Sequence, residues 1–136
     1  MGREPRQVTV VGGGLAGLAL GLALRQRGVP VELFEAGRYP RHRVCGEFMA
    51  GRGWEVLRDL GLEPRFSRMG LSWGESTAWF VGGRRVGRWD LPRRAACLTR
   101  HDLDAAMAEL LVERGGVLRE RSRWSGDTGA EGVVRA

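Results

Sequence analysis

The stretch Val8-Thr9-Val10-Val11-Gly12-Gly13-Gly14-Leu15-Ala16-Gly17 decides the fold of this 136-residue chain. Its first four residues predict a buried strand, and the apolar run that follows the glycines predicts a helix. Gly12, Gly14 and Gly17 have the G-x-G-x-x-G spacing that cradles a dinucleotide pyrophosphate. The first glycine permits a tight turn, the second lets phosphates approach the backbone, and the third lets the helix pack closely on the strand.

The residues around this turn strengthen the prediction of a dinucleotide site. Leu15 and Ala16 open the expected helix over residues 15–27, and their free N–H groups would face the anion. The expected second strand, residues 31–35, ends on Glu35, at about the 20-residue offset of the fingerprint. A carboxylate at Glu35 can accept two hydrogen bonds from an adenosine ribose. An ordinary βαβ unit with glycine-rich turns is the structural alternative.

The composition favours one globular domain. Hydrophobic residues make up 43% of the chain and charged residues 28%, which is typical of a folded rather than a disordered protein. A net charge of +6 raises a nucleic-acid hypothesis. However, all 22 basic residues are arginines, and they are scattered without a run longer than two. We therefore attribute the charge to genomic bias and expect no nucleic-acid partner.

The apolar segment at residues 8–24 could be mistaken for a signal peptide or a membrane span. Its five glycines weaken a helix, it falls short of the ~20 apolar residues that a span requires, and no cleavage site follows it. We expect no integral membrane segment. Cys45 and Cys97 form neither a C-x-x-C pair nor a metal cluster, so we expect no metal site and a cytoplasmic location.

The remaining segments predict an α/β fold. The strands at residues 8–11, 31–35 and 117–120 would form the parallel sheet of a Rossmann-like domain. Between the second and third strands lies a long insertion with a β-hairpin turning at Gly82-Gly83. The other expected elements are helices at 53–60 and 100–114, a connector at 63–75, hairpin arms at 77–81 and 84–89, and a second hairpin within 124–134.

Three stretches in this order resemble FAD-dependent oxidoreductases of the aromatic-hydroxylase fold, especially the geranylgeranyl-reductase-like group. The first is the glycine turn with Glu35 beyond it. The second is Pro40-Arg41-His42-Arg43-Val44-Cys45-Gly46, which looks like that group's P-x-x-[KR]-x-C-G loop. The third is Arg100-His101-Asp102-Leu103-Asp104, which looks like its R-x-x-L-D segment. The second stretch is the most specific of the three.

The resemblance implies a cofactor and a role for each matched position. FAD would be the cofactor, with NAD(P)H as a possible reductant and an apolar organic molecule as the substrate. Gly12, Gly14 and Gly17 would hold the pyrophosphate, and Glu35 the ribose. Arg43 and Arg100 would be cationic partners of the phosphates, and Cys45 and Gly46 would lie toward the isoalloxazine ring. No catalytic acid or base is evident in the sequence.

The chain also departs from this family. Two later motifs that would complete the FAD site, an Asp-Gly and a Gly-Asp-Ala segment, are missing, as is the main sheet of the substrate domain. We therefore expect residues 1–136 to be a partial domain, truncated at its C-terminus, from a flavin-dependent oxidoreductase or monooxygenase. The alternatives are an NAD-dependent dehydrogenase domain, which the carboxylate at Glu35 would favour over an NADP enzyme, and an inactive fragment.

Overall fold

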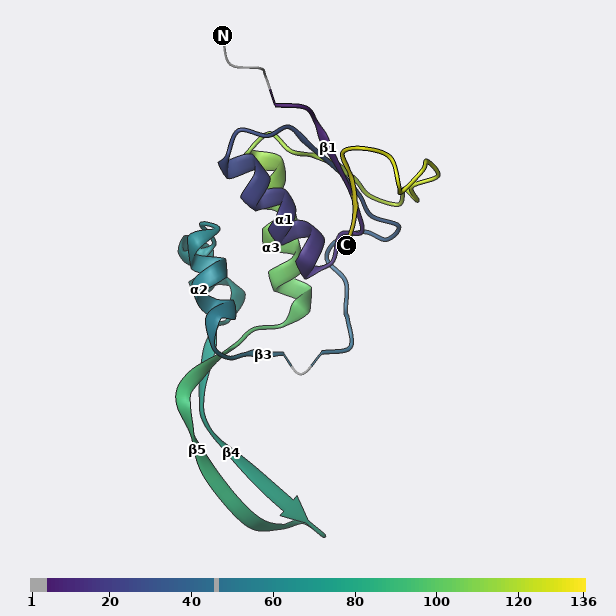
Figure 1. Ribbon diagram of the computed structural model, residues 1–136. Coiled ribbons are helices and arrows are strands. Elements are labelled where there is room, and N and C mark those ends of the chain that lie inside the picture. Colours follow the sequence, from purple (N-terminus) through teal and green to yellow (C-terminus); the bar gives the residue numbers. More distant parts are fainter. Residues whose placement is uncertain (1–4, 46) are drawn as a thin grey trace. The chain divides into compact units, whose positions relative to one another are not determined.

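A computed structural model describes residues 5–45 and 47–136 of the protein, which divide into two compact units (Figure 1). The first unit contains the residues up to Arg43 and those from His101 onward. The second unit, Val44–Arg100, corresponds to the long insertion expected from the sequence.

The first unit contains a four-stranded parallel sheet in the order β6-β2-β1-β7. The strands are β1 (Val8–Val11), β2 (Val31–Phe34), β6 (Val117–Arg119) and β7 (Val133–Arg135). Val10 lies opposite Leu33, and Leu33 lies opposite Leu118. The sheet confirms the three predicted strands and their parallel pairing. Val10 and Leu33 are fully buried, as expected for strands covered by helices.

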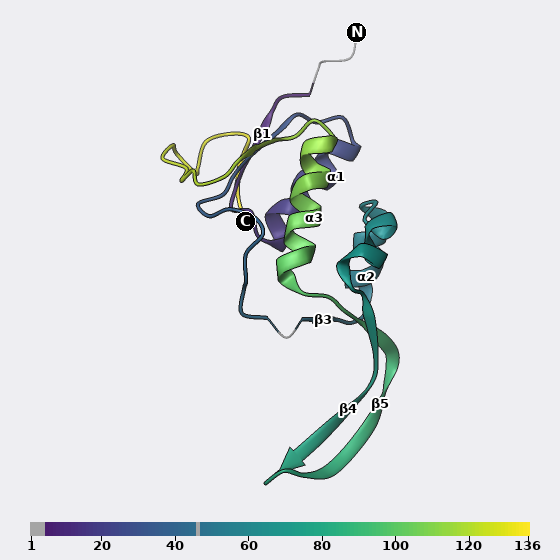
Figure 2. The same cartoon turned by 180° about the vertical axis from the view of Figure 1, so that it is seen from behind.

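Two helices accompany this sheet, α1 (Leu15–Gln26) and α3 (Arg100–Glu113), and they run side by side in both views (Figures 1 and 2). A Cβ atom on Gly21 of α1 would lie 3.2 Å from a methyl group of Leu111 on α3, so the two helices make close contact at this position. α1 connects β1 to β2, and α3 leads into β6, which lies on the other side of β2. Both connections therefore step across the sheet in the same direction. Right-handed crossovers therefore place them on the same face.

The C-terminal part of the first unit corrects one expectation. The sequence predicts a hairpin within residues 124–134, whereas the structure has no strand between Arg119 and Val133. Val133–Arg135 instead forms β7, which pairs in parallel with β1 and places Val134 opposite Val10. The backbone N–H and C=O groups of Val133 and Val134 can form hydrogen bonds in an antiparallel hairpin or in a parallel pair. The parallel pairing is formed because the edge of β1 is open to accept this strand.

The second unit has an antiparallel sheet in the order β3-β5-β4. Its elements are β3 (Phe48–Met49), α2 (Arg52–Asp59), a 3-10 helix (Glu63–Met69), β4 (Ser72–Val81) and β5 (Arg84–Cys97). The predicted hairpin is confirmed, although its arms are longer than expected. The expected connector at 63–75 is wrong in part, because it contains the 3-10 helix and the start of β4. Trp54 packs on Phe66 and Trp73, with ring centroids 4.0 and 4.9 Å apart.

Among the described residues, no helix is both long enough and apolar enough to cross a membrane.

Candidate dinucleotide site

The glycine turn joins β1 to α1, and its three motif glycines have different physical reasons to be glycine. Gly12 has a φ of +111°, which favours a residue without a side chain. A Cβ atom on Gly17 would lie 1.9 Å from the carbonyl oxygen of Gly12, so the packing of the helix on the turn requires Gly17. A Cβ atom on Gly14 would meet nothing within 4 Å, and its φ is −80°. Neither the backbone conformation nor the packing of the protein therefore requires glycine at position 14.

The open space at Gly14 lies at the N-terminus of α1. Gly14 is the N-cap residue, and no side chain caps the helix. The first turn also carries no acidic residue. The first N–H groups of a helix have no partner within the helix and attract anions. Leu15 is half-buried and Ala16 is exposed, so a phosphate can approach this end. The turn therefore fits a pyrophosphate.

Glu35 follows β2 and is only 5% exposed. Its Oε2 atom accepts a hydrogen bond from the N–H of Gly13 at 2.9 Å, which ties the carboxylate directly to the glycine turn. Its Oε1 atom accepts hydrogen bonds from the N–H of Gly37 and from Nη1 of Arg41, both at 2.7 Å. Burial alone would raise the pKa of Glu35, but these hydrogen bonds outweigh it and hold the pKa below its usual value. Glu35 is therefore ionised at neutral pH.

Tyr39 and Arg41 complete this environment, and the sequence analysis assigned no role to either. The hydroxyl of Tyr39 donates a hydrogen bond to the carbonyl oxygen of Gly13. Burial, reinforced by the negative charge of Glu35, raises the pKa of Tyr39, so its hydroxyl stays protonated and can donate. The guanidinium of Arg41 lies over the Tyr39 ring, 5.6 Å from its centroid. Both residues lie within six positions of Glu35, and Arg41 also belongs to the loop that carries the family resemblance.

The other predicted site residues fall into two groups. Nη2 of Arg43 lies 3.7 Å from Oε2 of Glu35, so this arginine stands beside the carboxylate within the first unit. Cys45 and Arg100 belong to the second unit, and Cys45 is an exposed free thiol. Gly46 lies outside the described residues. The structure therefore gathers Gly12, Gly14, Leu15, Ala16, Gly17, Glu35 and Arg43 in one unit. The binding roles of all ten residues stay predictions.

A cavity of about 320 Å³ adjoins the turn at the carboxyl ends of β1 and β2. In parallel α/β sheets, ligands bind outside these strand ends. Phe34 and Trp124 line the cavity and meet edge to face, with ring centroids 4.9 Å apart. Gly12, Glu35 and the two cationic residues Arg123 and Arg135 also line it. The cavity therefore combines aromatic surface and positive charge with both ends of the predicted fingerprint.

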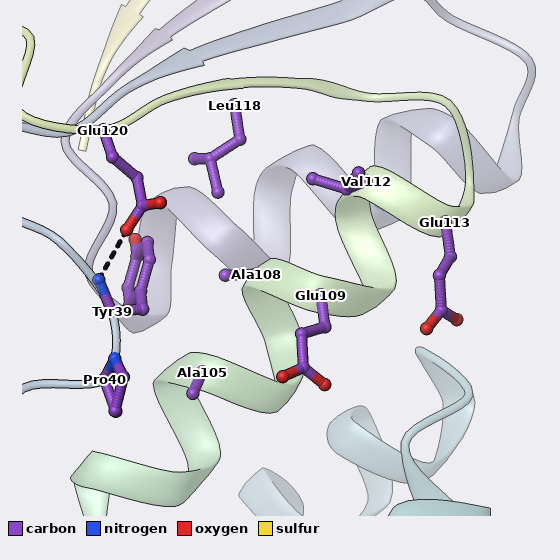
Figure 3. A pocket seen from close by; sticks show the side chains of 9 residues that line it. All are labelled: Tyr39, Pro40, Ala105, Ala108, Glu109, Val112, Glu113, Leu118 and Glu120. Atoms are coloured by element: carbon purple, nitrogen blue, oxygen red, sulfur yellow. Dashed lines mark hydrogen bonds between the residues drawn. The ribbon is translucent and has the colours of Figure 1, made fainter.

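A second cavity, of about 430 Å³, lies between α3, β6 and the segment at Tyr39 (Figure 3). Its lining includes Glu109, Glu113 and Glu120, and the carboxylate of Glu120 accepts a hydrogen bond from the N–H of Tyr39 at 2.6 Å. No residue of the glycine turn lines it. Carboxylates disfavour a negatively charged dinucleotide, so this larger cavity is the poorer candidate despite its size.

Comparison with known proteins identifies the dinucleotide as FAD. Residues 6–136 match the family described as FAD binding domain. The chain belongs to this family. The tetracenomycin B2 monooxygenase-dioxygenase of Streptomyces olivaceus is 31% identical over 137 residues, covering 99% of this chain and 25% of that protein. The tetracenomycin A2 monooxygenase-dioxygenase of Streptomyces glaucescens is 30% identical over 139 residues, covering 99% and 24%.

Solved structures resemble the chain in the same way. The flavin-dependent monooxygenase PieE, in complex with FAD and substrate, has a TM-score of 0.71 at 26% identity, over 85% of this chain and 24% of PieE. The oxygenase of 2-methyl-3-hydroxypyridine-5-carboxylic acid has a TM-score of 0.77 at 24% identity, over 90% of this chain and 33% of that chain. At this identity the likeness supports the fold alone. The family match and these likenesses confirm the predicted Rossmann-like FAD-binding fold. The chain spans about a quarter of the length of its curated relatives.

Proposed function

We propose that this chain is the FAD-binding part of a flavin-dependent monooxygenase that acts on an apolar organic molecule. The observation that carries the proposal is the open space at Gly14. It lies at an uncapped helix N-terminus, beside a buried carboxylate that is hydrogen-bonded to the same turn. The names of the relatives support the monooxygenase activity, which belongs to proteins about four times as long as this chain.

In this proposal the two ends of the site hold two parts of the cofactor. The backbone of Gly12, Gly14 and Gly17, with the N–H groups of Leu15 and Ala16, binds the pyrophosphate of FAD. Glu35 accepts hydrogen bonds from the adenosine ribose.

The remaining assignments rest on the resemblance. Arg43 and Arg100 supply positive charge to the phosphates, and Cys45 and Gly46 lie toward the isoalloxazine ring. Arg43 has geometric support, because it already stands beside Glu35.

When bound, FAD supplies the hydride and oxygen chemistry, with NAD(P)H as the proposed reductant. The described residues of the first unit bind and orient the adenosine end. Glu35 and Tyr39 stay in fixed protonation states at neutral pH, because their pKa values are shifted away from 7 in opposite directions. We therefore assign both residues to binding, and we propose no residue of this chain as a catalytic acid or base.

Parallel titrations of the purified chain with FAD and with NADH test the cofactor. Quenching of flavin fluorescence reports FAD binding, and tryptophan quenching reports both ligands. We expect FAD to bind at least ten times more tightly than NADH. Tighter binding of NADH would favour the NAD-dependent dehydrogenase alternative, and a folded chain that binds neither ligand would contradict the proposal.

The loop from Pro40 to Gly46 supports a second candidate, a reductase of the geranylgeranyl-reductase-like group. Oxygen consumption by the complete enzyme separates the two activities. A monooxygenase consumes one O₂ for each NAD(P)H oxidised in the presence of substrate, whereas a reductase turns over without O₂. We also propose a cytoplasmic location, for which the sequence argument from the two unpaired cysteines is the support.

A further inference from the structure

We propose that Arg41 is a displaceable counter-ion, which occupies on Glu35 the positions that the ribose hydroxyls of the cofactor take over. This inference rests on the proposed function, because it concerns how the same site receives FAD. It assigns to Arg41 a positioning and gating role that is distinct from phosphate binding.

Most hydrogen-bonding positions of the Glu35 carboxylate are already occupied. A carboxylate offers about four lone-pair positions. Oε1 already accepts two hydrogen bonds, from the N–H of Gly37 and from Nη1 of Arg41. Oε2 accepts one from the N–H of Gly13, and Nη2 of Arg41 lies 2.6 Å from it. Oε1 therefore has no free position, and the guanidinium, with Nη2 in contact with Oε2, blocks the remaining position on Oε2 from a ribose diol.

The N–H donors of Arg41 are only partly satisfied by Glu35. Its Nη2 and Nε atoms are buried but make no hydrogen bond, so Nη2 is only an ion-pair contact of Glu35. A buried ion pair offsets its desolvation only when the remaining donors are also satisfied. Nη1 alone is well satisfied in this pair. The pair is therefore suited to exchange, whereas the two backbone N–H groups remain bound to Glu35 throughout.

The position of Arg41 in the chain makes the exchange possible. Arg41 follows β2, and the described residues between Phe34 and Phe48, namely 35–45 and 47, form no helix or strand. Its side chain is 22% exposed, compared with 6% for that of Glu35. The guanidinium can therefore swing toward solvent without unfolding an element, while the carboxylate stays fixed by Gly13 and Gly37. Glu35 keeps hydrogen-bond donors in both states, first from Arg41 and then from the ribose, and the positive charge of Arg43 stays 3.7 Å from its Oε2 atom.

The test compares ADP with 2′,3′-dideoxy-ADP, which lacks both ribose hydroxyls. The dissociation constant of the dideoxy compound divided by that of ADP defines the diol preference. Because both ligands carry the same pyrophosphate, this ratio cancels any contact between Arg41 and phosphate. In the wild-type chain we expect a diol preference below about threefold, since hydrogen bonds from the ribose replace the hydrogen bond and the ion-pair contact of Arg41.

The variant Arg41→Met removes the guanidinium but keeps a chain of comparable length. We expect its diol preference to rise about ten- to hundredfold, the effect of an added hydrogen bond to a charged group. Arg43→Met is the matched control and should keep the wild-type ratio, because Arg43 lies 3.7 Å from Glu35. Adding Glu35→Gln to Arg41→Met should return the ratio to below about threefold. If Arg41→Met does not fold, Arg41→Lys, with a single compact donor group, provides the same comparison.

Two results would overturn the inference while leaving the proposed function intact. One is a diol preference above tenfold in the wild-type chain that Arg41→Met does not change, which would mean that ribose binds with Arg41 in place. The other is a ratio that stays near one in every variant while ADP still binds. A folded wild-type chain that binds neither ADP nor FAD would instead contradict the proposed function.

Discussion

Replacing Gly14 with alanine should leave the chain folded and remove tight FAD binding. The added methyl group meets no atom within 4 Å, and the backbone is at φ −80°, where alanine is unstrained. A less flexible unfolded chain contributes about 0.4–1 kcal/mol of stability. The poorer N-cap residue costs a similar amount. We therefore expect the free energy of unfolding to change by less than about 1 kcal/mol.

The same methyl group projects into the space that we assign to the pyrophosphate. Losing one hydrogen bond between the phosphate and the backbone costs about 1.5–3 kcal/mol, and every 1.4 kcal/mol is about tenfold in affinity. The dissociation constant for FAD should therefore rise about ten- to hundredfold. Titration by flavin fluorescence measures this change, and thermal melting by circular dichroism measures the stability.

Gly17→Ala is the matched control, because it adds the same group three residues later. Its methyl group would lie 1.9 Å from the carbonyl oxygen of Gly12, so the backbone must move. Overpacking of this kind costs about 1–3 kcal/mol or more, and each kcal/mol lowers the Tm by about 3 °C or more in a chain of this size. A Gly14→Ala variant that binds FAD like the wild-type chain would refute the assignment of the pyrophosphate to this turn.

Three further predictions concern stability and association. The pKa of Glu35 is lowered in the folded state, so the stability that it contributes is present above the ordinary glutamate pKa of 4.5 and is lost as the pH falls through the folded pKa. Urea unfolding of Glu35→Gln should therefore show a smaller acid-induced loss of stability than the wild-type chain. Equal losses in both chains would contradict this. Trp124→Phe should lower the free energy of unfolding by less than about 1 kcal/mol, because the buried indole N–H has no partner. Trp124→Ala should lower it further, because it also loses the edge contact with Phe34, worth about 0.5–1.5 kcal/mol. Chemical denaturation measures both variants, and equal losses would contradict the importance of this ring contact. Trp79 and Trp89 are 63% and 55% exposed on the hairpin, so we predict that the chain self-associates through this surface at high concentration. The double variant Trp79→Ser/Trp89→Thr should sediment as a smaller species than the wild-type chain. Identical sedimentation of the two chains would contradict the prediction.

Much of the first unit could be predicted from sequence, because its signals are local. The strand at Val8–Val11, the glycine turn and the helix that follows are contiguous, and each is encoded by periodicity or by glycine spacing. Glu35 could be identified from its offset along the chain. The hairpin in the insertion was also predictable from its Gly-Gly turn. The assignment of residues 124–134 failed, because the alternation of short apolar segments fits a hairpin as well as it fits a parallel edge strand.

The sequence by itself determined the β-α-β unit and predicted the cofactor class, which the family match confirms. The binding residues that it indicates at both ends of the site stay a prediction. Only the tertiary structure decided that Gly17 is needed for packing while Gly14 leaves space for a ligand, since this difference depends on atoms brought close by folding. It also decided that Arg41 and Tyr39 turn back onto Glu35 and Gly13, and that Val133–Arg135 joins the edge of β1. Contacts of this kind depend on how the elements pack, and no periodicity in the sequence encodes them.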